Sequence, residues 1–188
     1  MNPEVQTPAI ILDAHVNSFD ILFTARYLRK QYPEVPILMP IAGYLLHVPG
    51  VSKWVKYWSN KYAITITPVY RREEISPNKS IPLAFFTSFY PKILTERERK
   101  ERNNQFQLLA TRFLEDMRGI VLVSPYGGPV HYGGKVRRGV RELLSKAQQV
   151  YLSYSSIFTG KTKLEKYHVQ EAGEESELIL SFRKLTAS

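Results

Sequence analysis

The sequence predicts an α/β fold in which helices cover both faces of a mostly parallel central sheet. Short, nearly continuous apolar runs recur along the chain, and such runs are typical of strands that are buried on both faces. Segments whose apolar residues repeat every three or four positions, as on one face of a helix, lie between these runs. No internal repeat, low-complexity tract or linker divides the 188 residues, so we expect a single domain over residues 1–188.

The first 70 residues alternate these two patterns. After the first apolar run, an N-cap at Asn17 or Ser18 begins a helix, and Pro33 follows its end. Residues 71–94, which are rich in proline and aromatic residues, receive no regular element. The expected elements are a strand over 8–14, a helix from 17 or 18 to 32, a strand over 36–41, one or two short helices within 44–60, and a strand over 62–70.

The second half of the chain begins with a long helix. Thr95 is its expected N-cap, and the apolar residues from Phe106 to Met117 follow the spacing of one buried helical face. The elements expected after it are a strand over 119–123, a glycine-rich loop over 125–134, a basic helix over 136–149, and strands over 150–158 and 178–182.

Composition limits the possible functions. A net charge of +9 calls for an anionic partner, which can be nucleic acid, an acidic membrane surface or a small phosphorylated substrate. The absence of cysteine excludes thiol nucleophiles, disulfides and cysteine-ligated zinc. We expect no signal peptide, because the N-terminus has neither a basic region nor a long apolar run, and no transmembrane helix, because prolines and glycines interrupt the uncharged stretch 35–52.

The loop after the first strand holds a candidate general base. Ligands of α/β proteins bind beyond the carboxyl ends of strands, and His15 and Asp20 follow such an end. With His15 in the loop and Asp20 in the first helical turn, the carboxylate can orient the imidazole, whose other nitrogen then takes a proton from a hydroxyl. The alternative is structural, because an acidic residue in a first turn also favours the helix dipole, and His15 would then be an ordinary loop residue.

The glycine-rich loop over 124–135 is the second candidate. It leads into a basic helix, and glycine backbone amides next to arginines are suited to phosphate groups. The alternative is a surface loop before a solvated basic face. No P-loop, G-x-G-x-x-G or H-E-x-x-H motif is present, and the other three histidines (His47, His131 and His168) are isolated, so we expect neither a nucleotide cofactor nor a metal.

The motifs resemble those of the glycerolipid acyltransferase family, typified by lysophosphatidic acid acyltransferase. Residues 14–20 are similar to its Asn-His-x4-Asp motif and keep both His15 and Asp20. Residues 64–71 look like the second motif, with Arg71 at the arginine position, residues 123–129 are similar to the Phe-Pro-Glu-Gly-Thr-Arg-like third motif, and residues 150–154 would be the fourth. The order and spacing agree over residues 8–158, which implies a glycerolipid acyltransferase-like fold.

The resemblance implies an O-acyltransferase that moves a fatty acyl group from acyl-CoA or acyl-carrier protein to a hydroxyl acceptor, a lipid or lysolipid. His15 would be the general base and Asp20 would orient it. No cofactor beyond the acyl thioester co-substrate is implied, and no metal. The residues implied in substrate binding are Ser18, Arg71, Tyr126, Gly127 and Gly128.

The third motif departs from the family pattern. Tyr126 replaces the glutamate, Gly128 the threonine or serine, and Pro129 the arginine, which removes charged contacts to a glycerol-phosphate acceptor and suggests an uncharged or differently shaped one. The chain begins close to its first strand, so we expect none of the N-terminal helices that commonly precede this domain.

Three hypotheses about function follow from these patterns. The first is the enzyme, in the cytoplasm or peripheral on the cytoplasmic face of a membrane. The second is a catalytically silent relative that binds anionic membrane or a protein partner. Nucleic-acid binding is the least favoured, because charge and interspersed aromatics support it without any recognisable module.

Overall fold

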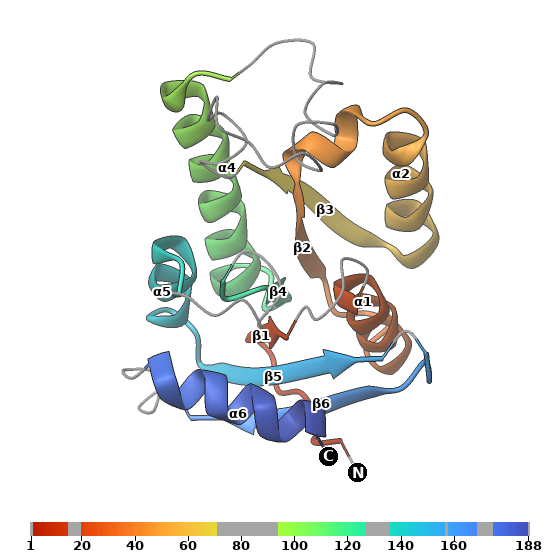
Figure 1. Ribbon diagram of the computed structural model, residues 1–188, viewed down its shortest axis with the longest axis vertical. Helices are drawn as coiled ribbons and strands as arrows, with labels where there is room; N and C mark the ends of the chain where they lie inside the picture. The colour runs from red at the N-terminus through yellow and green to blue at the C-terminus, as the bar shows by residue number, and fades with distance from the viewer. Residues whose placement is uncertain are drawn as a thin grey trace.

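The computed structural model describes residues 2–14, 20–70, 94–126, 136–156, 158–168 and 175–187. Within these residues six strands form one sheet in the order β3-β2-β4-β1-β5-β6 (Figure 1). The first five strands run parallel, and β6 pairs antiparallel with β5. The strands are β1 (Ala9–Asp13), β2 (Ile37–Ala42), β3 (Ile64–Val69), β4 (Ile120–Val123), β5 (Gln149–Ser155) and β6 (Thr162–Tyr167).

The centre of the sheet consists of apolar strands that are covered on both sides. β1 lies between β4 and β5, with Leu12 opposite Val123 on one side and Leu152 on the other. Every residue of β1 and of β4 is buried. Such strands need apolar side chains on both faces, which is why their continuous apolar runs were recognisable in the sequence.

Helices lie on both faces of this sheet, as predicted. On one face, Ile11 and Leu122 pack with Leu28 of α1, and α2 packs beside it through Trp58 and Tyr62. On the other face, side chains of β1, β4 and β5 pack with α4, α5 and α6. The helices are α1 (Asp20–Gln31), α2 (Val51–Tyr62), α4 (Glu96–Glu115), α5 (Arg138–Leu144) and α6 (Glu175–Ala187), with a 3-10 helix, η1 (Gly43–His47), before α2.

The predicted N-cap of the long helix is confirmed. The Thr95 hydroxyl accepts a hydrogen bond from the backbone N–H of Glu98 at 3.2 Å, and the Glu98 carboxylate accepts from the backbone N–H of Thr95 at 2.7 Å. This capping box satisfies two N–H groups that helix geometry leaves without intrahelical partners. It sets the start of α4, which covers the sheet face opposite α1.

The prediction of a strand over 178–182 is wrong, because these residues belong to α6. Leu178, Phe182 and Leu185 are buried at the i, i+4, i+7 spacing of one helical face, whereas Leu180 is exposed. The run Leu-Ile-Leu-Ser-Phe, with four apolar residues in five, conceals that spacing. No helix in the described part of the chain is long and apolar enough to cross a membrane.

Two further elements, a helix and a strand, differ from the prediction. The basic helix expected over 136–149 is shorter: α5 ends at Leu144, and Gln149 already begins β5. β6 was not predicted at all. Its sequence, Thr-Lys-Leu-Glu-Lys-Tyr, is mostly polar because it lies at the edge of the sheet and pairs only with β5 in the described structure.

Candidate functional site

The two strands that precede the sequence motifs lie side by side in the sheet. β1 and β4 are adjacent and parallel, so their carboxyl ends, at Leu12 and Val123 in register, lie at the same edge. The chain goes from β1 to α1 on one face and from β4 to α5 on the other (Figure 1). Diverging connections of this kind form the crevice in which open α/β sheets bind ligands.

Of the predicted site residues, the structure describes Asp20 and Tyr126. His15, Ser18, Arg71, Gly127 and Gly128 lie outside the described residues. Asp20 begins α1, the helix after β1, and Tyr126 follows the end of β4, so the two residues come after adjacent strands of the sheet. Their roles, and those of the five other residues, stay predictions.

Asp20 is the first residue of α1 and is fully buried. The sequence predicted this position in the first helical turn. Backbone N–H groups at a helix start favour a negative charge, so α1 offers this carboxylate a favourable electrostatic environment beyond the end of β1. A carboxylate is rarely buried without such compensation, which makes Asp20 a fixed polar group in this part of the sheet edge.

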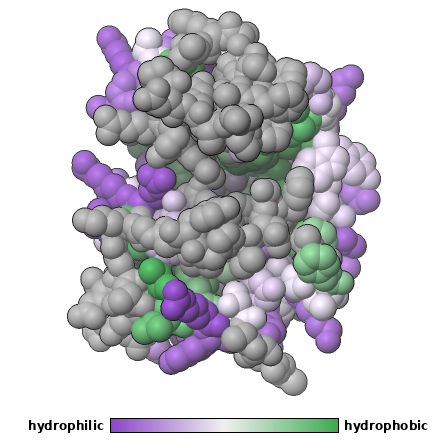
Figure 2. Space-filling model, in the orientation of Figure 1, coloured by the Kyte–Doolittle hydropathy of each residue, from purple (hydrophilic) through white to green (hydrophobic). Residues whose placement is uncertain are grey.

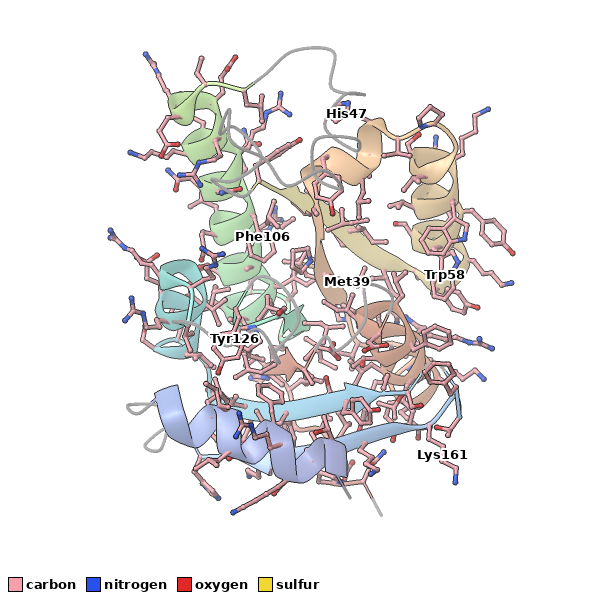
Figure 3. All side chains as sticks on the ribbon, in the orientation of Figure 1. Met39, His47, Trp58, Phe106, Tyr126 and Lys161 are labelled. Carbon is pink, nitrogen blue, oxygen red and sulfur yellow. The ribbon has the colours of Figure 1, made fainter. Side chains whose placement is uncertain are left out.

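Tyr126 lies in the apolar cluster on the face of α4 and α5. Its side chain is 6% exposed, and Figure 3 shows it on the side of Phe106 of α4, away from Met39 and Trp58. Arg137, just before α5, donates from its side chain to the Tyr126 carbonyl at 3.0 Å and from its backbone N–H to the Pro125 carbonyl. The start of the glycine-rich loop is therefore tied to the start of α5.

Tyr70 ends the described part of the chain before Arg71, and α4 holds it in place. The backbone N–H of Tyr70 donates to the Asn103 side-chain oxygen at 2.9 Å, and its carbonyl accepts from the Asn103 amide at 2.8 Å. Arg102 donates to the Tyr70 hydroxyl at 2.8 Å and lies over its ring. Arg99 also donates to the Tyr70 carbonyl, at 3.4 Å, so three residues of α4 hold the residue that follows β3.

A histidine at the end of η1 lies close enough to an arginine of α4 to be affected by its charge. Partial burial and, second, the guanidinium of Arg102 lower the pKa of His47, the last residue of η1. A lowered histidine pKa indicates that the neutral imidazole is favoured at neutral pH. Among the described residues, no group of three or more histidine, aspartate or glutamate side chains is arranged to hold a metal ion.

A buried polar network at the end of β1 was missed by the sequence analysis. Asp13 Oδ2 accepts hydrogen bonds from the hydroxyls of Thr24 in α1 and Ser153 in β5, each at 2.7 Å. Thr24 also bonds to Ser155 at 2.7 Å, and Ser155 to Thr162 at the start of β6 at 2.8 Å. The network joins β1, α1, β5 and β6, and Asp13 is the last residue of β1.

The donors in this network follow a fixed order. Each hydroxyl has one proton, and Thr24 donates its proton to Asp13, so Ser155 must donate to Thr24 and Thr162 to Ser155. Chained hydrogen bonds of this kind strengthen one another in a buried environment. A polar residue ending an apolar strand, Asp13, and the Ser-x-Ser pattern of Ser153 and Ser155 were the available sequence signals.

Thr24→Val is expected to destabilise the fold by about 2–3 kcal/mol, because it removes one donor to Asp13 and leaves Ser155 without its acceptor in the core. The control is Thr111→Val, another helical threonine, whose hydroxyl bonds to the exposed Lys146. We expect little change there. Urea unfolding of both variants measures the difference, and equal stabilities would contradict a structural role for the network.

Comparisons of the chain with protein-family models, with curated proteins and with solved structures found no match. The resemblance of its motifs to the glycerolipid acyltransferases therefore rests on the residues themselves.

Proposed function

We propose that the protein is an acyltransferase that moves a fatty acyl group from acyl-CoA or acyl-carrier protein to a hydroxyl of a lipid or lysolipid acceptor. One observation carries the proposal: the two motifs follow adjacent parallel strands, β1 and β4, whose next helices, α1 and α5, lie on opposite faces of the sheet. This arrangement supports a single site for motifs that are more than 100 residues apart in the sequence, because ligands of open α/β sheets bind where neighbouring strands lead to opposite faces.

In this proposal His15 takes the proton of the acceptor hydroxyl, and the hydroxyl oxygen attacks the carbonyl carbon of the thioester. The tetrahedral intermediate then collapses, the carbon–sulfur bond breaks, and the proton on the imidazolium passes to the leaving thiolate. Asp20 holds the imidazole and balances its charge. Its burial at the start of α1 supports this role, because a fixed carboxylate orients a base better than a mobile one.

The charges around the crevice favour an anionic acyl donor. The start of α5 carries Arg137, Arg138 and Arg141, and Glu142 is the one acidic residue of this helix. Phosphates of CoA or acidic residues of a carrier protein are suited to such a rim. Tyr126, in place of the family glutamate, supports an acceptor without a charged headgroup at that position.

The test is transfer of a labelled acyl group from a panel of acyl-CoA and acyl-carrier-protein donors to hydroxyl and lysolipid acceptors. We expect an ester product with at least one pair, and a preference for acceptors that lack a phosphate. If folded protein transfers no acyl group to any acceptor, the enzyme proposal is wrong, and a catalytically silent, acyltransferase-like binding protein becomes the better description.

A further inference from the structure

α2 presents aromatic and basic side chains together on its outer face. Trp54 is 38% exposed and Tyr57 is 54% exposed, although large aromatic side chains usually pack inside. Lys53, Lys56 and Lys61 are also exposed, and the helix contains no acidic residue. We call these five residues the α2 surface. Figure 2 shows this flank, where Figure 1 places α2, as pale residues with hydrophilic tips.

The inner face of α2 is fixed to the protein. Val55 is buried, and Trp58 and Tyr62 pack towards the α1 face of the sheet. Arg29 of α1 donates to the carbonyls of Tyr62 at 2.8 Å and of Ala63 at 2.6 Å, which satisfies carbonyls at the end of the helix. The α2 surface is thus the outer face of an anchored helix, and exposed groups on it contribute little to packing.

The arrangement of the rings limits what can bind there. The Lys61 ammonium lies 5.2 Å from the Tyr57 ring centroid and 5.7 Å from that of Tyr62, and it donates to the Tyr57 hydroxyl. Trp58 lies between Trp54 and Tyr62, with ring centroids 5.4 and 4.7 Å away. The Tyr57 hydroxyl and one side of the Trp54 ring are therefore engaged within α2 itself, which leaves less ring surface for nucleic-acid bases to stack on.

A lipid surface matches these groups better. Indole and phenol rings with an apolar body and a polar edge favour the boundary between headgroups and acyl chains, and they need no free ring face to enter it. Lysines spaced around them attract anionic headgroups. The hydrogen bond to Tyr57, and after it the nearby phenol oxygens, raise the pKa of Lys61, which favours the charged amine still further.

We propose that the α2 surface binds anionic lipid membranes peripherally, with Trp54 and Tyr57 at the headgroup boundary and the three lysines on the headgroups. This inference is independent of the proposed acyl transfer, because membrane binding requires neither an acyl donor nor a hydroxyl acceptor. It names the face on which the protein would meet a membrane.

The protein carries its own reporter of this contact, because Trp54 and Trp58, both in α2, are its two tryptophans. Vesicles with about one-third phosphatidylserine are expected to shift the tryptophan emission to shorter wavelength, and lipids brominated on their acyl chains to quench it. Pure phosphatidylcholine vesicles are expected to have little effect, and about 0.5 M salt to reverse the shift. No shift with anionic vesicles at low salt would overturn the proposal.

Two variants of equal net charge distinguish lipid binding by the α2 surface from general electrostatic attraction between the protein and the vesicle. The combined change Lys53→Gln, Lys56→Gln and Lys61→Gln is expected to weaken vesicle binding by about 100-fold, roughly fivefold for each lysine. The control changes Lys100, Lys161 and Lys166, exposed lysines outside α2, to glutamine and is expected to stay within about threefold of wild type. Equal weakening of both variants would contradict the assignment to α2.

Two other outcomes are informative. If single-stranded oligonucleotides or an acidic protein shift the emission and vesicles do not, the lipid proposal is wrong.

Thermal unfolding of each variant tests whether it is folded. Because binding is measured without a thioester, a protein that binds vesicles but transfers no acyl group would overturn only the enzyme proposal, and the reverse result would overturn only this one.

Discussion

His15→Ala is expected to lower the rate of acyl transfer by about 10³-fold, because general-base catalysis contributes roughly 10²–10⁴. Without the imidazole, the acceptor hydroxyl must lose its proton to water, which is a weak base. The measurement is the initial rate of ester formation with the best donor and acceptor from the panel. Asp20→Asn is expected to lower the same rate, because the amide neither balances the imidazolium charge nor holds the same tautomer.

The matched control is His168→Ala, which removes an exposed histidine that follows β6. We expect its rate to equal that of the wild type. If His15→Ala retained full activity while remaining folded, His15 would not be the base, even if the protein proved to be an acyltransferase. If both histidine variants lost activity equally, a general loss of stability would explain the result better than catalysis.

Phe182→Ala is expected to destabilise the protein by about 3–5 kcal/mol, the usual effect of removing a buried aromatic ring. Phe182 is 1% exposed and packs, from α6, into the cluster that also contains Leu143 and Val150. Domains of this size are stable by only about 5–15 kcal/mol, so this one change would remove a large share. Denaturant unfolding measures the loss.

Leu180→Ala is the control for this experiment, and it also tests the helix itself. Leu180 is 52% exposed in α6, so its removal is expected to change stability by no more than about 0.5 kcal/mol. In a strand, Leu178, Leu180 and Phe182 would share one face, and the two alanine variants would be similarly destabilised. Similar losses would therefore contradict the helical assignment of these residues.

Comparing the predicted elements with the observed ones shows which parts of the fold the sequence could reveal. The central strands β1 and β4 are buried throughout, and their apolar composition distinguishes them, whereas β3, at the sheet edge, was predicted from the alternation of isoleucine and threonine. α6 was misread because Leu178 to Phe182 is as apolar as a strand, and its helical spacing appears only when Leu185 is included. β6 was missed because an edge strand takes its structure from its partner, β5, rather than from its own composition.

The sequence indicated the two candidate loops but not that their strands are neighbours in the sheet. The two loops were chosen because a motif follows a buried strand, and the sheet order then brought their strands together. The sequence could not reveal that order, which depends on packing between distant segments. The Asp13 network was missed for the same reason, since Asp13 and Ser153 are 140 residues apart and acquire their hydrogen bond only through the pairing of β1 with β5.

The most direct test of the proposed chemistry is product analysis by mass spectrometry after the wild-type protein is mixed with an acyl thioester and a hydroxyl acceptor. We predict an O-acyl ester and a free thiol in equal amounts, formed at a rate proportional to protein concentration and lost in His15→Ala. Free thiol without ester, or ester formed equally well by His15→Ala, would contradict acyl transfer by His15 at the edge between β1 and β4.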